Sequence, residues 1–200
     1  MHLFSLEGNI GSGKTTLLNR LHEFLGERVV ILYEPFDKWT SLPLDNEANT
    51  SCNLLQLFYQ NPSKHSMTFQ MYILLTKVEQ LMQAIKDNPD KIIFCERSPT
   101  TDYDVFVKAL HSDGLSTDEE RAVYKQWFDM VYRDLNKTVT VHPIYLRVPP
   151  HICMERILKR NRKGEENIDM RLISRLHDRH EELLEKDSTL IKITRVSKRC

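Results

Sequence analysis

Residues 8–15 read Gly8-Asn9-Ile10-Gly11-Ser12-Gly13-Lys14-Thr15, a complete Gly-x-x-x-x-Gly-Lys-Thr phosphate loop. The loop directly follows an apolar run, residues 3–6, so a buried strand, the loop and a helix opening at Lys14 are predicted in that order. Glycines let successive backbone N–H groups turn inward around an anion, and the helix start adds its positive dipole end. Lys14 suits the terminal phosphates, and Thr15 suits Mg²⁺. We therefore expect a bound nucleoside triphosphate; this context disfavours a chance match to a Gly-rich turn.

The composition of the chain indicates one domain and a small ligand. No Pro/Gly/Ser-rich linker divides its 200 residues, so we expect a single domain over residues 1–200. The 28 acidic and 28 basic residues balance, which argues against nucleic-acid or membrane-surface binding and favours a small anionic partner. Four scattered cysteines suit a reducing compartment: Cys52, Cys95, Cys153 and Cys200. With no targeting peptide and no apolar stretch of about 18 residues, we expect a soluble, cytoplasmic protein.

Five short apolar runs alternate with helical patterns along the chain. They cover residues 3–6, 29–32, 92–95, 144–148 and 190–193. Such runs are typical of strands buried on both faces, and their alternation with helices predicts a three-layer α/β fold with a five-stranded parallel sheet. Ligands bind at the carboxyl ends of the strands in such sheets, so functional residues are expected directly after the runs.

One long helix is predicted between the second and third runs. Apolar residues recur at helical spacing and predict a core-facing stripe: Met67, Met71, Leu74, Leu75, Val78, Met82 and Ile85. Gln70, Ile73 and Lys77 share a different face of this helix. Because two polar groups flank an aliphatic one there, this face suits the wall of a polar pocket.

Carboxylates follow two of the predicted strands. Glu34 comes after the second run, and Glu96 with Arg97 after the third. Together with the phosphate loop, they would place two acids and an arginine in one crevice, as phosphoryl transfer requires. The alternatives are a solvated acid at Glu34 and a local ion pair between Glu96 and Arg97.

Six segments in order resemble the deoxynucleoside kinase family, in a register that runs from Leu3 to about Leu184. They are Glu7-Gly8-Asn9-Ile10-Gly11-Ser12-Gly13-Lys14-Thr15, Glu34-Pro35 with Trp39, Phe58-Tyr59, Thr68-Phe69-Gln70, Glu96-Arg97-Ser98, and Arg160-Asn161-Arg162 followed by Glu165. Only the first is specific by itself, but six in order are highly specific. The resemblance implies a P-loop NTPase-type fold, ATP as phosphate donor, Mg²⁺ as cofactor and a homodimer.

The resemblance also implies roles for the residues at the strand ends. Glu34 would take the proton from the nucleoside 5′-hydroxyl, a task that needs position more than a raised pKa. Arg97 would hold this region and the transferring phosphate, and Glu96 with Thr15 would hold Mg²⁺. Gln70 would read a pyrimidine edge through its carboxamide. The remaining substrate residues would be Trp39, Phe58 and Phe69 as aromatic walls and Tyr59 with Glu165 at the sugar 3′-hydroxyl; ordinary core packing is the alternative for the aromatic rings.

A basic segment, residues 156–163, follows the fourth predicted strand. By composition it could be a nuclear-import or nucleic-acid patch. It fits better with the lid of the family, at about residues 156–168, which closes over the triphosphate. ATP would then contact Thr16, Arg156 and Arg160 besides the loop, and Arg160 and Arg162 would join Glu34, Arg97 and Lys14 in catalysis.

Three positions depart from the family pattern. Gly164 stands where cellular relatives often carry an acid, so either Glu165 or Glu166 could reach the sugar. Lys77 and Asp102 stand where deoxycytidine-preferring members pair an arginine with an aspartate, and lysine lacks the planar fork of arginine. Asp102 could instead be a first-turn helix acid after Ser98-Pro99. Ile73 resembles the branched residue of thymidine-using members, so the base preference stays open.

These observations favour an ATP-dependent deoxynucleoside kinase that acts on thymidine, deoxycytidine or both. A nucleoside monophosphate kinase such as thymidylate kinase is the alternative enzyme, but Glu34 would repel a phosphate acceptor. A nucleotide-dependent switch is the alternative from another class. The sequence has neither Asp-x-x-Gly after the third run nor the Asn-Lys-x-Asp loop of GTPases, which disfavours it.

Overall fold

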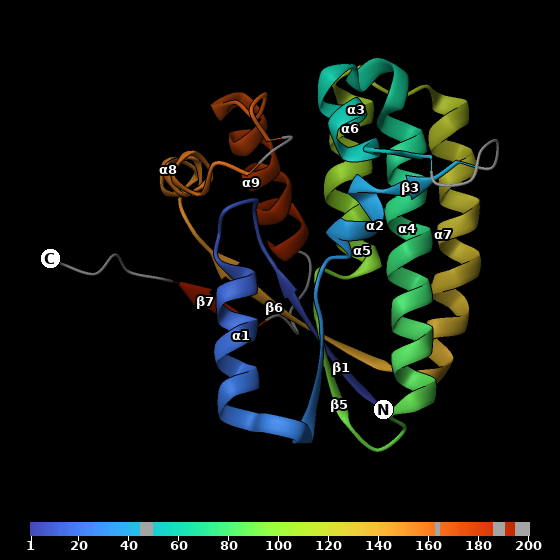
Figure 1. The fold of residues 1–200 in the computed structure, drawn as a ribbon, viewed down its shortest axis with the longest axis vertical. Helices are drawn as coiled ribbons and strands as arrows, with labels where there is room; N and C mark the ends of the chain where they lie inside the picture. Colours follow the sequence, from blue (N-terminus) through green and yellow to red (C-terminus); the bar gives the residue numbers. More distant parts are fainter. Residues whose placement is uncertain (45–49, 163–164, 186–190, 195–200) are drawn as a thin grey trace, which may run out of the picture.

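The computed structural model describes residues 1–44, 50–162, 165–185 and 191–194 (Figure 1). Its centre is a five-stranded parallel sheet in the order β2-β5-β1-β6-β7. The strands are β1 (His2–Glu7), β2 (Val29–Leu32), β5 (Ile92–Glu96), β6 (Thr140–Arg147) and β7 (Ile191–Thr194). A separate antiparallel pair joins β3 (Leu42–Pro43) to β4 (Ser51–Cys52). The predicted α/β fold with five parallel strands is confirmed.

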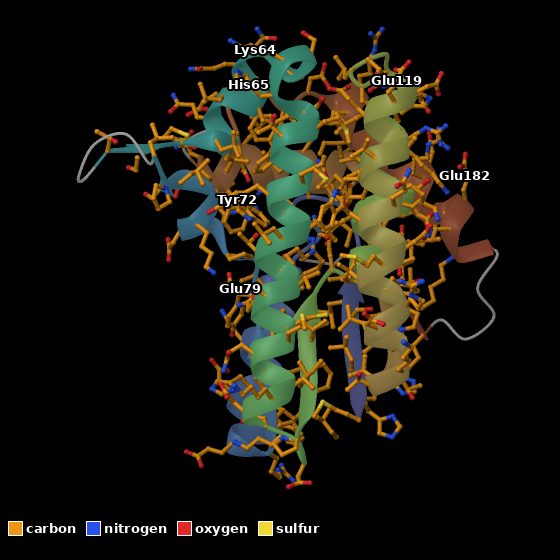
Figure 2. The ribbon with its side chains drawn as sticks, turned by 90° about the vertical axis from the view of Figure 1, so that its right-hand side faces the viewer. Lys64, His65, Tyr72, Glu79, Glu119 and Glu182 are labelled. Carbon is orange, nitrogen blue, oxygen red and sulfur yellow. The ribbon has the colours of Figure 1, made fainter. Side chains whose placement is uncertain are left out.

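Helices cover both faces of this sheet. Helix α1 (Lys14–Leu25) covers one face, and α4 (Pro62–Asp87), α7 (Asp118–Thr138) and α9 (Met170–Glu185) cover the other (Figures 1 and 2). Neighbouring strand residues divide accordingly: Phe94 packs toward α1, whereas Ile93 and Cys95 pack toward α4 and α7. The other helical segments are η1 (Gly26–Arg28), α2 (Phe36–Thr40), α3 (Leu54–Gln60), α5 (Pro99–Thr101), the π-helical η2 (Asp102–Val107), α6 (Lys108–Ser112) and α8 (Pro150–Arg160).

Strand β6 differs from its prediction, because it starts four residues before residue 144 and ends at Arg147 rather than at Val148. Its first half contains His142 and Pro143, which interrupt the apolar run. That half pairs with β1 alone, since β7 joins only from Ile144 onward. A proline is tolerated there because the unpaired side needs no N–H donor. Residue 190, predicted to start the last strand, lies outside the described residues.

The apolar stripe of α4 is narrower than predicted. Leu74 and Val78 are buried, but Leu75 is 63% exposed and Met82 is 60% exposed. The prediction that these two residues face the core is therefore wrong. The core side of α4 is instead completed by the separate face of Gln70, Ile73 and Lys77, which is buried. Figure 2 shows α4 and α7 side by side, with Tyr72 and Glu79 along α4. No helix in the described part of the chain is long and apolar enough to cross a membrane.

Candidate active site

The phosphate loop joins β1 to α1 at the carboxyl edge of the sheet, where its glycines allow close packing. Gly8 and Gly11 have φ angles of 146° and 77°, a backbone conformation that residues with a Cβ rarely adopt. A Cβ on Gly8 would lie 2.8 Å from the carbonyl oxygen of Leu146, and one on Gly11 would lie 2.5 Å from that of Cys153. The loop is thus pressed against the end of β6 and against α8.

Side-chain hydrogen bonds tie the loop to two other helices. The Asn9 amide donates to the carbonyl oxygen of Ile173 in α9 at 2.8 Å. Arg156 of α8 donates to the carbonyl oxygen of Ser12 at 2.9 Å and that of Gly11 at 3.4 Å. Five residues of the predicted ATP site also line the cavity described below, namely Ile10, Gly11, Lys14, Thr15 and Arg160, while Thr16 is exposed on α1.

Lys14 is buried beneath the loop. Its Nζ donates to the carbonyl oxygens of Gly8 and Asn9 at 3.2 and 2.9 Å and lies 3.7 Å from Oε1 of Glu96. Burial lowers the pKa of Lys14 to about 8, and the nearby Arg97 charge acts in the same direction. An anion bound in the loop would stabilise the charged form of this lysine.

Thr15 and Glu96 meet at the mouth of the loop. The Thr15 hydroxyl donates to Oε2 of Glu96 at 2.9 Å, and Glu96 is buried. A hydroxyl beside a carboxylate offers the hard oxygen ligands that Mg²⁺ prefers, with its other positions left to phosphate and water. These two residues therefore fit the predicted metal.

Glu34 and Arg97 form an ion pair between the ends of β2 and β5, with side chains only 9% and 6% exposed. Burial alone would raise the pKa of Glu34, but Arg97, helped by Lys77 and Lys14, holds it below its ordinary value. The Arg97 guanidinium also lies 5.0 Å from the centre of the Phe106 ring. Both alternatives, a solvated Glu34 and a local Glu96–Arg97 pair, are therefore wrong.

A cavity of about 330 Å³ opens in front of this pair. Its lining includes the predicted residues Glu34, Trp39, Phe58, Tyr59, Phe69, Gln70, Ile73, Glu96, Arg97, Arg160, Arg162 and Glu165. The rings form a packed wall, with Phe69 5.1 Å from Phe58 and 5.8 Å from Trp39 between ring centres. Gln70 is 3% exposed, and its Oε1 has no hydrogen-bond partner in the described part of the protein. A buried orphan acceptor beside an aromatic wall suits a planar polar ligand.

Lys77 and Asp102 form a second buried ion pair, with Nζ 2.8 Å from Oδ2. Burial raises the pKa of Asp102, although the charge of Lys77 acts in the opposite direction. Burial would lower the pKa of Lys77, but the charges of Asp102 and Glu34 raise it above its ordinary value. Asp102 does stand at the start of a helical segment after Ser98-Pro99, as the helix-start alternative expected, but its carboxylate is buried in this ion pair. However, neither side chain is among the residues that line the cavity. Their direct contact with a base stays a prediction.

The predicted sugar and lid residues come together in the wall of the same cavity. Arg160 donates to both carboxylate oxygens of Glu165, at 2.9 and 2.6 Å, and Arg162 lies 3.7 Å from Glu165. Burial raises the pKa of Tyr59, and the Glu165 charge adds to this. Glu165 is buried in the cavity wall, whereas Glu166 is exposed. The placement therefore favours Glu165 over Glu166 for the sugar contact. Residues 163–164 of the predicted lid lie outside the described part of the chain.

Phe106 and Leu55 are among the lining residues that the sequence analysis did not single out. Phe106 follows Asp102 by four positions within η2, and Leu55 precedes Phe58 by three on α3. Helical spacing from residues already singled out could have indicated both. π-Helical turns such as η2 occur often at functional sites, but they have no reliable sequence signal.

A phosphate loop that lines the same cavity as a buried acid–arginine pair is typical of a phosphotransferase that binds a nucleotide and a second small substrate. Residues 4–199 match the model of the family described as deoxynucleoside kinase. The chain belongs to this family.

Individual relatives agree with this membership. The chain is 34% identical to deoxycytidine kinase 2 of Gallus gallus over 190 residues, which cover 88% of this chain and 71% of the relative. It is 30% identical to the mitochondrial deoxyguanosine kinase of Xenopus laevis over 196 residues, 92% of this chain and 74% of the relative. It is 33% identical to a probable deoxycytidine kinase of fowlpox virus over 184 residues, 92% and 72% of the two chains.

Proposed function

We propose that the protein is an ATP-dependent deoxynucleoside kinase that transfers the γ-phosphoryl group to the 5′-hydroxyl of deoxycytidine and thymidine for nucleotide salvage. The observation that carries this proposal is the buried Glu34 carboxylate, which lines the same cavity as Lys14 and Thr15 of the phosphate loop. A carboxylate at this place suits an acceptor hydroxyl that must lose a proton. It would repel the charged acceptor of a nucleoside monophosphate kinase. The relatives named as deoxycytidine and deoxyguanosine kinases support the substrate class.

Glu34 acts as the general base in this proposal. Its lowered pKa keeps it ionised at neutral pH, and its bond to Arg97 fixes its direction. A weak base suffices, because the hydroxyl proton becomes acidic only as the oxygen bonds to phosphorus. Arg97 has a second task, since its positive charge is close enough to offset charge on the transferring group.

Thr15 and Glu96 are the residues that would hold Mg²⁺. The bound ion would neutralise part of the charge on the donor phosphates. Lys14 and the N–H groups of the loop would orient the same phosphates. Arg156, Arg160 and Arg162 form the proposed lid with residues around them, about 156–168, and their guanidinium groups would reach the phosphoryl oxygens when it closes.

The other side of the cavity would hold the nucleoside. Gln70 offers a donor and an acceptor to a pyrimidine edge, and its unpartnered Oε1 supports that task. Phe69 and Phe106 would flank the base. Tyr59 and Glu165 would bind the 3′-hydroxyl, and the Tyr59 ring beneath the sugar would leave little space for a 2′-hydroxyl.

The remaining proposals concern the whole chain. We infer one kinase domain over residues 1–200 that forms a homodimer. Support for the dimer comes from exposed apolar side chains on the neighbouring helices α4 and α7, among them Leu75, Met82 and Trp127. Small-molecule substrates rather than nucleic acid or membrane remain the proposed partners. The free thiols of Cys52 and Cys95 suit the cytoplasm.

A panel of acceptors tests the proposed function. Purified protein with Mg²⁺ and ATP is offered the four natural deoxynucleosides and, separately, dTMP. We expect phosphorylation of deoxycytidine and thymidine and no conversion of dTMP. Efficient formation of dTDP would instead assign the protein to the monophosphate kinases.

A further inference from the structure

The turn that carries Arg97 is backbone-strained. Arg97 has a φ angle of 61°, in the left-handed region that residues with a Cβ rarely adopt. Such conformations persist only where their surroundings hold them. Two hydrogen bonds from β1 do so: the Arg97 N–H donates to the carbonyl oxygen of Leu6 at 3.0 Å, and the Ser98 N–H donates to Oε1 of Glu7 at 3.0 Å.

The second of these bonds comes from a side chain that is costly to bury. Glu7 is 2% exposed, and its Oε2 has no hydrogen-bond partner in the described part of the chain. It does not line the cavity, so it does not touch a substrate there. A buried carboxylate that only filled space would be replaced favourably by an apolar group.

The hydrogen bond that Ser98 donates to Glu7 also orders residues that follow Arg97. Ser98 caps α5, because its Oγ accepts from the Thr101 N–H at 3.3 Å, and its carbonyl oxygen accepts from the Asp102 N–H at 3.2 Å. The same short segment continues into η2, which carries Phe106 over the Arg97 guanidinium. Glu7 therefore fixes the point from which Arg97, Asp102 and Phe106 all project.

We propose that Glu7 is a positioning residue for phosphoryl transfer: it accepts from Ser98 and thereby holds Arg97 in the strained turn that directs its guanidinium to Glu34. This inference rests on the proposed kinase function. Glu7 holds the turn through the reach of its hydrogen bond and not through its charge, because a neutral oxygen at the same place would accept the same bond from Ser98.

Three variants separate reach from charge. Glu7→Gln keeps the length and one acceptor oxygen but removes the charge, so its kcat should stay within about threefold of the parent. Glu7→Asp keeps the charge but is one methylene shorter, so its kcat should fall at least about tenfold, with the KM for the deoxynucleoside nearly unchanged. Ser5→Ala, two residues away on the same buried strand, is the matched control and should match the parent.

A double-variant comparison identifies the route of the effect. In an Arg97→Ala background the further change Glu7→Asp should lower the residual kcat by less than about threefold, because the group that Glu7 positions is already gone. Equal losses with and without Arg97 would overturn the proposal. So would a Glu7→Gln variant as slow as Glu7→Asp, or a Glu7→Asp variant as fast as the parent.

Amide exchange of Ser98, followed by NMR, gives a readout that needs no activity. The Ser98 N–H should exchange slowly in the parent and in Glu7→Gln, and at least about tenfold faster in Glu7→Asp. If Glu7→Asp does not fold, slow exchange with preserved kcat in Glu7→Gln still supports the proposal, and fast exchange in the folded parent refutes it. A parent that phosphorylates no deoxynucleoside refutes the proposed function instead.

Discussion

At the scale of single residues, the environment of Glu34 decides how the site would work. Glu34→Gln keeps the shape of the side chain and one oxygen that accepts from Arg97 but removes the basic carboxylate. We expect kcat to fall at least about a hundredfold while the deoxynucleoside KM changes little. Steady-state kinetics on both proteins check this. If binding and turnover fell together, Glu34 would have a structural role.

Lys14 provides a pH dependence whose sign follows from its environment. In the free protein its pKa is lowered to about 8, and bound phosphates should raise it again. At a pH between the pKa values of free and phosphate-bound Lys14, binding of the ATP donor is accompanied by protonation of Lys14. The affinity for ATP should therefore fall as the pH rises through about 8. Titration calorimetry with Mg²⁺ and ATP at pH 7 and pH 9, in two buffers of different ionisation enthalpy, measures both effects. Equal affinities without proton uptake would contradict this role for Lys14.

At the scale of elements, α8 and the residues after it divide into cations that face the cavity and cations that do not. Arg160 and Arg162 line the cavity, whereas Lys159 on the same helix is exposed and outside its lining. Arg160→Ala and Arg162→Ala should each lower kcat by at least about a hundredfold, because they remove charge stabilisation at the transferring group. Lys159→Ala is the matched control and should retain activity.

A binding assay addresses the alternative of a nucleic-acid patch. Affinity for duplex and single-stranded DNA should be weak in the parent and in both arginine variants. A strong, steeply salt-dependent affinity in the parent that disappears in the variants would assign this segment to nucleic acid.

The contact between α4 and η2 through Lys77 and Asp102 should set base preference. Asp102→Ala alone leaves Lys77 buried without a partner and should destabilise the protein by about 3–5 kcal/mol, whereas Lys77→Met with Asp102→Ala should cost much less. The double variant should shift relative kcat/KM from deoxycytidine toward thymidine by roughly 1–3 kcal/mol. Denaturant unfolding and side-by-side kinetics measure the two effects. An unchanged substrate ratio would leave selectivity to Gln70 and Ile73.

At the scale of the whole molecule, the exposed apolar side chains of α4 and α7 predict a dimer. Leu75 is 63% exposed and Trp127 is 50% exposed, on two helices that pack side by side. Trp127→Glu should convert a dimer to a monomer in sedimentation velocity, while Phe24→Glu, another exposed apolar position on α1, should not. A parent that sediments as a monomer at micromolar concentration would refute the dimer.

The sequence predicted those parts of the molecule that depend on local pattern. The phosphate loop and the strand ends that carry Glu34 and Arg97 follow from glycine spacing and apolar runs, which are properties of short segments. The features that the sequence did not predict depend on contacts between segments that are far apart in the chain. Leu75 and Met82 repeat at core spacing but are exposed because no described element packs over them, and β6 extends through Pro143 because β1 offers it a partner there.

The burial of the Lys77–Asp102 pair has an evolutionary consequence. A lineage that loses this pair one substitution at a time passes through a destabilised protein. Either single substitution leaves the other residue as an unpaired charge in the interior. The intermediate would be less stable than both its ancestor and its descendant. Historical change at these two positions is therefore expected to be correlated, with stabilising substitutions elsewhere preceding it.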